Sequence, residues 1–252
     1  MEFSIEAWAA FAPGIGATPE AWQAWARQPH PPHGDDQPAL AEMAPMQRRR
    51  VDRLGRMALQ VAWQCQPDPD PGMPLVFASR HGDLARTYAM LGELARDEPL
   101  SPTHFGLSTH NAIAAQYSIA RTLTGNYTVV SAGAATAEAA VVEALALLAD
   151  GARAVLVVVY DGPTPDDYAA FRDEPEGEYA WAWRVVPPRA GLPVLELGRG
   201  GAGLPVPDTG HARPPESGTA GLPHGLDVLR FLLAGDATLA VPGDGGTWHR
   251  HA

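Results

Sequence analysis

The stretch YTVVSAGAATAEAAVVEALALLADGARAVLVVVY, residues 127–160, decides the fold class. It opens with the β-branched run Tyr127 to Ser131, bends at Gly133-Ala134-Ala135, and continues into an apolar segment with helical character, Ala137 to Ala149. Ala154 to Tyr160 then forms a continuous apolar run, typical of a strand in a parallel sheet that is covered on both faces. A strand, a bend, a helix and a second strand in this order predict a right-handed βαβ unit, and therefore an α/β fold.

The helix of this unit is apolar nearly all round, apart from Glu138 and Glu143. A helix of this kind is usually buried on all sides. We therefore expect the two strands to be neighbours in a mostly parallel sheet, with the helix buried beneath them. An aspartate in place of Val142 or Leu145 is then expected to unfold the chain, because an unpaired buried charge is strongly destabilising.

Outside this stretch, apolar periodicity and the positions of Gly and Pro predict further strands and helices. The expected strands are Phe3–Phe11, Leu75–Ser79, Trp181–Val186 and Val194–Leu197, and the expected helices are Gln47–Trp63, Leu84–Arg96, Asn111–Leu123 and Leu226–Leu233. The acidic segment between Thr164 and Glu178 and the Gly- and Pro-rich residues 198–225 are predicted as loops. With 252 residues, 46% of them hydrophobic, the chain is expected to be a single domain over 1–252.

The composition excludes several classes of partner. A formal charge of −11 argues against nucleic acid, which requires clustered basic residues. No apolar run reaches the length of a transmembrane helix, and Glu2 and Glu6 are unlike the basic start of a secretory signal. The lone cysteine, Cys65, fits a reducing compartment. We therefore expect a cytoplasmic protein without a transmembrane segment.

Several segments, read in order, resemble the amino-terminal half of a β-ketoacyl synthase of the thiolase-like fold. They are the arginine-rich stretch Arg48–Arg56, the segment Ser101–Phe105 leading to Asn111-Ala112, the stretch Gln116–Ile119 and the stretch Gly125–Ser131. In that family an Asn-Ala pair and a Gly-Gln-x-Ser-Ile stretch lead into Gly-Pro-x-x-Thr-Ile-Ser and then into the turn that carries the nucleophilic cysteine. The resemblance covers roughly residues 45 to 160 and implies a thiolase-like half-domain.

The departure from the family pattern lies at that turn. Alignment with the family's Ile-Ser-Thr-Ala-Cys places Ala134 at the cysteine position, and a slip of one residue would place Gly133 there. Neither side chain can form the thioester that a ketosynthase requires. The family's two catalytic histidines, from its second half, have no counterpart either, since His211, His224, His249 and His251 match neither histidine motif.

A ketosynthase-like chain without these groups resembles a chain-length factor, here of the aryl-polyene or xanthomonadin pigment type. The resemblance implies a non-catalytic subunit that forms a heterodimer with a catalytic β-ketoacyl synthase and works beside an acyl carrier protein. Chain-length factors usually carry Gln at the cysteine position, which this chain does not. The resemblance also implies a partner interface, walling the acyl tunnel, at Thr128, Val129 and Val130, with Asn111, Ala115 and Tyr117 close to it. It implies no cofactor and no metal.

Two other interpretations remain open: an acyltransferase or thioesterase-like enzyme on the same scaffold, and a stand-alone module that binds acyl groups or their carrier. Weaker signals favour neither. Gly198 to Gly203 matches a dinucleotide fingerprint, but the prolines that follow forbid the helix such a site requires. The pairs His30/His33 and His249/His251 lack companion ligands at metal-binding spacing, so surface histidines are expected.

Overall fold

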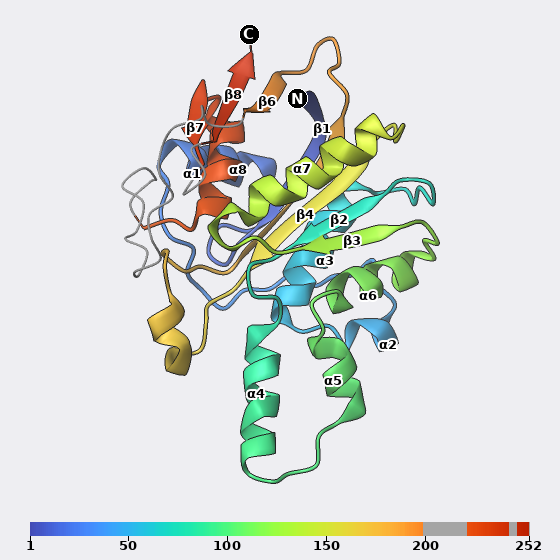
Figure 1. Cartoon of the computed structure of the whole chain (residues 1–252), viewed down its shortest axis with the longest axis vertical. Helices are drawn as coiled ribbons and strands as arrows, with labels where there is room; N and C mark the ends of the chain where they lie inside the picture. Colours follow the sequence, from blue (N-terminus) through green and yellow to red (C-terminus); the bar gives the residue numbers. More distant parts are fainter. Residues whose placement is uncertain (199–220, 242–245, 252) are drawn as a thin grey trace.

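The computed structural model describes residues 1–198, 221–241 and 246–251. In these residues eight strands form one sheet in the order β3-β2-β4-β5-β1-β6-β8-β7 (Figure 1). The strands are β1 (Glu2–Phe11), β2 (Leu75–Ala78), β3 (Tyr127–Val130), β4 (Val155–Asp161), β5 (Tyr179–Val186), β6 (Val194–Gly198), β7 (Thr238–Ala240) and β8 (Thr247–His251). The sheet is long enough to carry a helical layer on each face.

The strand directions make the sheet mixed. β2 runs parallel to β3 and to β4, with Leu75 opposite Tyr127 on one side and opposite Leu156 on the other. The remaining pairs, from β4–β5 to β7–β8, are antiparallel. The expected α/β class is confirmed, but the expectation of a mostly parallel sheet is wrong, because the strands after β4 connect as antiparallel neighbours.

The expected adjacency of β3 and β4 is also wrong. β2 lies between them, and all three strands run in the same direction. The helix that joins β3 to β4, α7 (Thr136–Ala149), therefore crosses over β2 and packs on both β2 and β4. The βαβ connection exists, but an earlier strand is inserted into it.

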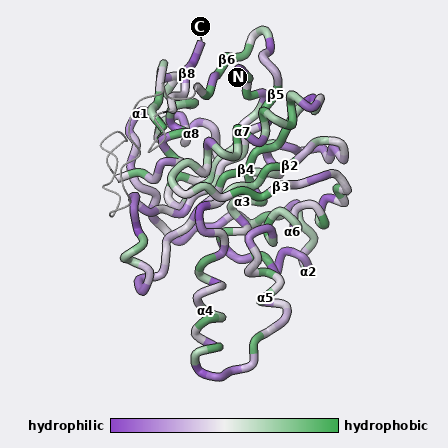
Figure 2. Tube along the Cα trace, viewed as in Figure 1, coloured by the Kyte–Doolittle hydropathy of each residue, from purple (hydrophilic) through white to green (hydrophobic). Residues whose placement is uncertain are grey.

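Helices cover both faces of the sheet, and apolar residues concentrate along its central strands (Figure 2). One face carries α7 together with α1 (Pro19–Arg27) and α8 (His224–Ala234). The other face carries α3 (Arg53–Cys65) and α6 (Ala112–Arg121), preceded by the short α2 (Pro45–Arg48). Two further helices, α4 (Leu84–Ala95) and α5 (Pro102–Ser108), form a hairpin that projects from the body, which we call the finger (Figure 1).

Helix α7 is not buried on all sides. Its inner stripe is buried, with Leu145 only 4% exposed, whereas Val142 is 51% exposed and Ala146 and Ala149 are also open to solvent. The helix lies on the sheet with one face, and no second layer covers that outer stripe among the described residues. The apolar outer face is therefore a surface feature of this chain.

Most of the Gly- and Pro-rich loop, residues 199–220, lies outside the described residues, as does the dinucleotide-like motif within it. The acidic segment after Thr164 contains one short 3₁₀ helix, η2 (Asp166–Phe171). No helix in the described part of the chain combines the length and the apolar character that a bilayer crossing requires.

An aspartate substitution is expected to change the free energy of unfolding much more on the buried stripe of α7 than on the exposed stripe. Leu145→Asp is expected to destabilise the chain by roughly 3 kcal/mol or more, because the carboxylate would be buried against β2 and β4 without a partner. Val142→Asp, on the exposed stripe, is expected to change the free energy of unfolding by only about 0.5 kcal/mol. Urea denaturation of both variants checks this difference, and equal destabilisation would contradict the assignment of the two faces.

Candidate functional site

The turn between β3 and α7, residues 131–136, is the elbow at which the family's nucleophile is expected. Gly133 adopts a φ of 57°, in the left-handed region that favours glycine. Thr136 fixes the turn: its Oγ1 donates to the Gly133 carbonyl at 2.7 Å and accepts from the backbone N–H of Ala132 at 3.0 Å. The sharp strand-to-helix turn is therefore present, and a short 3₁₀ helix, η1 (Gly133–Ala135), leads into α7.

Ala134 faces a very small cavity. The charged and polar side chains that line this cavity beside the elbow are Arg80, Asp161, Glu174 and Tyr179. The cavity volume of about 10 Å³ is that of a single water molecule. An acyl group carried as a thioester would not fit without displacing these side chains.

Asp161 ends β4 inside this cluster and is 8% exposed. Its Oδ1 accepts from the hydroxyl of Ser79 at 2.8 Å and from the backbone N–H of Arg80 at 2.9 Å, while the Tyr179 hydroxyl lies 3.4 Å from Oδ2. Burial raises the pKa of Asp161 to about 7, against the lowering effect of these hydrogen bonds and of the nearby Arg80 guanidinium. The carboxyl group thus titrates near neutrality.

Arg80 joins three segments that are distant in sequence. Its guanidinium, only 9% exposed, forms ion pairs of 2.6 Å with Asp173 and 2.5 Å with Glu174 in the acidic segment. Its backbone carbonyl accepts from the Ser131 hydroxyl at 2.8 Å, at the start of the elbow. The acidic segment, predicted as a loop, is therefore held over the elbow by one buried arginine.

A second buried ion pair continues this network from the first turn of α7 to α8 and β8. Glu174 accepts from the backbone N–H of His224 at 3.1 Å, and the His224 Nε2 lies 2.7 Å from Oε1 of Glu138. The indole N–H of Trp248 donates to the same oxygen at 2.8 Å. Burial alone would lower the pKa of His224, but the carboxylates of Glu138, Asp227 and Glu174 outweigh it and raise that pKa.

These groups are engaged with one another through hydrogen bonds and ion pairs. Ala134 presents a methyl group and Gly133 a hydrogen, the Ser131 hydroxyl is bonded to the Arg80 carbonyl, and His224 is held by Glu138. Cys65, the one thiol of the chain, is buried away from the elbow beneath β1 and β5, where burial raises its pKa to about 12. A thiol with such a pKa is inert at neutral pH.

A family model described as "Beta-ketoacyl synthase, N-terminal domain" matches residues 22–250. The chain belongs to this family. The resemblance drawn from the sequence is thereby confirmed, and the strand-to-helix elbow of this ketosynthase-family chain carries alanine and glycine at the two positions that the sequence alignment assigns to the nucleophile. A comparison with curated proteins found no significant match.

Solved structures extend the comparison. One is a chain of the complex of a ketosynthase, ApeO, with its chain length factor, ApeC, from Xenorhabdus doucetiae, with 26% identity, a TM-score of 0.77 and 100% coverage of both chains. The ishigamide ketosynthase/chain length factor has 17% identity and a TM-score of 0.63, covering 79% of this chain and 68% of its own. A β-ketoacyl synthase from Burkholderia phymatum STM815 has 14% identity and a TM-score of 0.58, and the match covers 82% of this chain and 66% of the synthase chain. The last two show the shared fold.

The predicted interface residues fall into two groups in this ketosynthase-like fold. Thr128, Val129 and Val130 lie on β3, which forms one edge of the sheet, and all three are half-buried. Asn111 is exposed at the start of α6. All four positions are at least partly exposed, and the interface at these residues stays a prediction.

Ala115 and Tyr117 lie on α6 beside that edge, but only Ala115 retains some exposure. Tyr117 is fully buried, donating to Oε1 of Gln66 at 2.9 Å and packing edge-on against Trp63. It offers no surface to a partner and acts by supporting α6 from within.

The remaining sequence signals have structural roles. Arg48 and Arg56 donate to backbone carbonyls, and Arg53 forms a 2.7 Å ion pair with Glu178. These three arginines of the arginine-rich stretch therefore have partners within the chain. His110 packs against Gly82 and approaches the Val130 carbonyl at 3.5 Å. Within the described residues no group of three or more histidine, cysteine, aspartate or glutamate side chains is placed to hold a metal ion.

The buried charges at the elbow were not predicted from the sequence. Arg80 follows the apolar run Leu75–Ser79, Asp161 follows the apolar run Ala154–Tyr160, and Glu138 interrupts an otherwise apolar helix. A charged residue in such a position rarely lies in the interior unless it is paired. That pattern is a usable signal for a buried network, although it does not identify the partners.

The raised pKa of Asp161 predicts a pH-dependent stability. The unfolded carboxyl group has a pKa of about 3.9, so between about pH 4 and 7 the folded chain holds a proton that the unfolded chain has released. Stability is therefore expected to fall as pH rises through this window, by about 1.4 kcal/mol for each unit of pKa difference. Asp161→Asn keeps the acceptor oxygen and is expected to remove this part of the slope.

Urea denaturation of both proteins between pH 5 and pH 8 provides the measurement. The pKa of His224 is also raised, so His224 lowers the free energy of unfolding as pH rises in both proteins. The difference between the two slopes therefore isolates the contribution of Asp161. Identical slopes in the two proteins would show that Asp161 is ionised throughout this range.

Proposed function

We propose that this chain is a non-catalytic, chain-length-factor-like subunit. It pairs with a catalytic β-ketoacyl synthase in the cytoplasm, in chain extension of the fatty-acid or aryl-polyene polyketide type. Its role is to complete a heterodimer and to help wall the tunnel in which the acyl chain grows, and it meets the acyl carrier protein through its partner. The observation that carries the proposal is the elbow: a methyl group stands where the family's nucleophile is expected, beside a cavity of about 10 Å³.

The buried charges support the absence of catalysis. An acyl-enzyme requires a thiolate or an activated hydroxyl with space for the acyl chain next to it. Here Arg80 forms an ion pair with Glu174 beside Ala134, and separating these two largely buried groups would be unfavourable. The alternative of an acyltransferase or thioesterase on this scaffold is disfavoured by the same observation.

The full-length likeness supports the partner. The chain matches, along its whole length, one chain of a complex that joins a ketosynthase to its chain length factor. A chain that shares this fold from end to end, and that lacks the nucleophile, fits the role of the chain length factor better than that of the ketosynthase. This argument also favours a heterodimer over a stand-alone acyl-binding module.

The open edge of the sheet supports an interface at β3. This strand pairs with β2 on one side, and none of the described strands pairs with its other side. Thr128, Val129 and Val130 are β-branched and half-buried, and an uncovered edge of this composition invites association. Pairing across this edge would satisfy its backbone groups.

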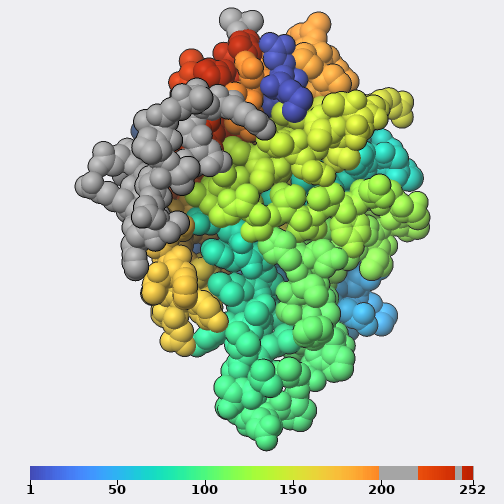
Figure 3. All heavy atoms as spheres, viewed as in Figure 1, coloured from blue at the N-terminus to red at the C-terminus, as the bar shows by residue number. Residues whose placement is uncertain are grey.

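Apolar side chains around this edge enlarge the surface that a partner would cover. The finger, α6 and α7 are all visible in the view of Figure 3, with α6 and α7 packed on opposite faces of the sheet. The large hydrophobic residues exposed on α4 to α7 are Tyr88, Leu91, Leu94, Phe105, Ile119 and Val142, with exposures between 37% and 67%. Exposed apolar surface marks protein interfaces, and the finger in particular has little of its own core, since Met90 is the one buried residue of α4 and α5.

A matched pair of lysine substitutions at the two edges of the sheet tests the proposal. Val129→Lys, on β3, is expected to abolish co-purification with a catalytic ketosynthase that binds the wild-type chain, because a charge would enter the apolar contact. Thr238→Lys lies on β7, the opposite edge, at an exposed position, and is expected to leave the complex intact.

Both variants are co-expressed with the tagged ketosynthase, and their folding is checked by thermal denaturation. Wild-type protein that fails to form any complex would contradict the proposed function itself. A Val129→Lys variant that is folded and co-purifies undiminished would show that β3 is not the contact.

A further inference from the structure

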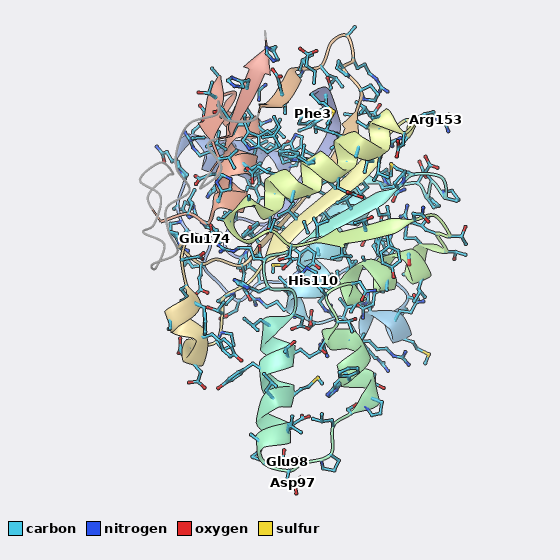
Figure 4. The ribbon with its side chains drawn as sticks, viewed as in Figure 1. Phe3, Asp97, Glu98, His110, Arg153 and Glu174 are labelled. Atoms are coloured by element: carbon cyan, nitrogen blue, oxygen red, sulfur yellow. The ribbon has the colours of Figure 1, made fainter. Side chains whose placement is uncertain are left out.

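A pocket of about 330 Å³ lies at the end of the sheet opposite the elbow. β4 and β5 run between the two sites: their far ends, Asp161 and Tyr179, belong to the elbow cluster, whereas Ala154 and Val186 line this pocket. Figure 4 labels Arg153, which lines the pocket, and Glu174, which belongs to the elbow cluster, at well-separated places in the structure. We call it the Arg153 pocket, and its charged residues are Arg153, Arg184, Arg189, Glu6 and Asp70.

A β-bulge in β1 shapes one wall. The register between β1 and β5 shifts between Ile5 and Ala7, so that Glu6 is an extra residue in the ladder. A bulge re-aims a side chain that a regular strand would direct elsewhere. The Glu6 carboxylate lies 2.9 Å from Nε of Arg184 and forms a second ion pair with Arg189, so it bridges the two guanidinium groups.

The arginines retain most of their hydrogen-bond donors. A guanidinium group carries five N–H donors, and Arg184 and Arg189 each engage Glu6 through one nitrogen in these ion pairs. Arg153 forms no hydrogen bond or ion pair within the described part of the chain. The pocket is lined by three guanidinium groups and by two carboxylates, those of Glu6 and Asp70. Its formal net charge is therefore +1.

The backbone places the three arginines around the pocket. Arg184 belongs to β5, and the backbone N–H of Arg189 donates to the Ser4 hydroxyl at 3.3 Å, directly after Pro187-Pro188. Arg153 follows Gly151, whose φ of 101° turns the chain sharply between α7 and β4. The side chains of Arg153 and Arg189 are exposed, so both guanidinium groups are accessible to a ligand from solvent.

We propose that the Arg153 pocket binds the phosphate group of a small phosphorylated molecule. Guanidinium forks match phosphate oxygens in geometry and charge. A volume of about 330 Å³ is at the lower end of the range for small-ligand sites, so the pocket holds a phosphate with a small organic group, which Met73 and Val186 contact. The site does not depend on the elbow or on the proposed partner.

Titration calorimetry of the whole wild-type chain with inorganic pyrophosphate tests the inference. We expect saturable binding of one pyrophosphate per chain. Arg153→Gln is expected to weaken it about tenfold or more, as the loss of a charge-assisted hydrogen bond implies. Arg27→Gln serves as the matched control, since Arg27 is exposed on α1 and forms no ion pair among the described residues, and it is expected to change binding less than twofold.

Citrate at equal ionic strength separates phosphate recognition from general attraction of anions. Citrate binding at least tenfold weaker than that of pyrophosphate supports the site, and equal binding overturns it. Unchanged pyrophosphate binding by Arg153→Gln also overturns it, as does an equal loss in Arg27→Gln. Arg189→Gln, at a half-exposed position, provides a second variant that is expected to fold and to lose affinity.

Discussion

The ion pairs of Arg80 with Asp173 and Glu174 are the interaction on which the functional region depends. Arg80 follows β2, its backbone contacts both Asp161 and Ser131, and its side chain holds the acidic segment over the elbow. Glu174 also accepts a hydrogen bond from the backbone N–H of His224, the first residue of α8. One buried cation therefore links the central strands, the elbow and the C-terminal helix, and its removal would leave the largely buried Glu174 carboxylate without this counter-charge.

The same charges lie beside the elbow of this ketosynthase-family fold. The elbow retains its sharp turn, with Gly133 in a left-handed conformation and Thr136 bridging the turn, so the sheet and α7 meet as the family fold requires. The space beside Ala134 is occupied by paired charges instead of an acyl group. The partner surface proposed at β3 gives a reason for keeping this scaffold in a chain with alanine and glycine at the elbow.

Local patterns in the sequence predicted the fold class and most elements, while pairing and burial required the structure. The β-branched run before the elbow and the apolar run before Asp161 are strands as expected. Their separation by β2 was not predictable, because β2 is a short apolar run with no signal for its neighbours. Apolar composition likewise overstated the burial of α7, since Val142 carries the same hydrophobicity as a core residue and yet faces outward. At the elbow, Ala134 was identified from the resemblance, whereas the partners of Arg80 depend on contacts over some ninety residues of sequence.

The most direct test of the central claim is intact-mass spectrometry of this chain in its complex with the ketosynthase, after incubation with an acylated carrier protein. We expect the mass of the ketosynthase to rise by one acyl group and the mass of this chain to stay unchanged. Alone, the chain is likewise expected to remain unmodified. A stable acyl adduct on this chain, in the complex or in isolation, would contradict a non-catalytic role.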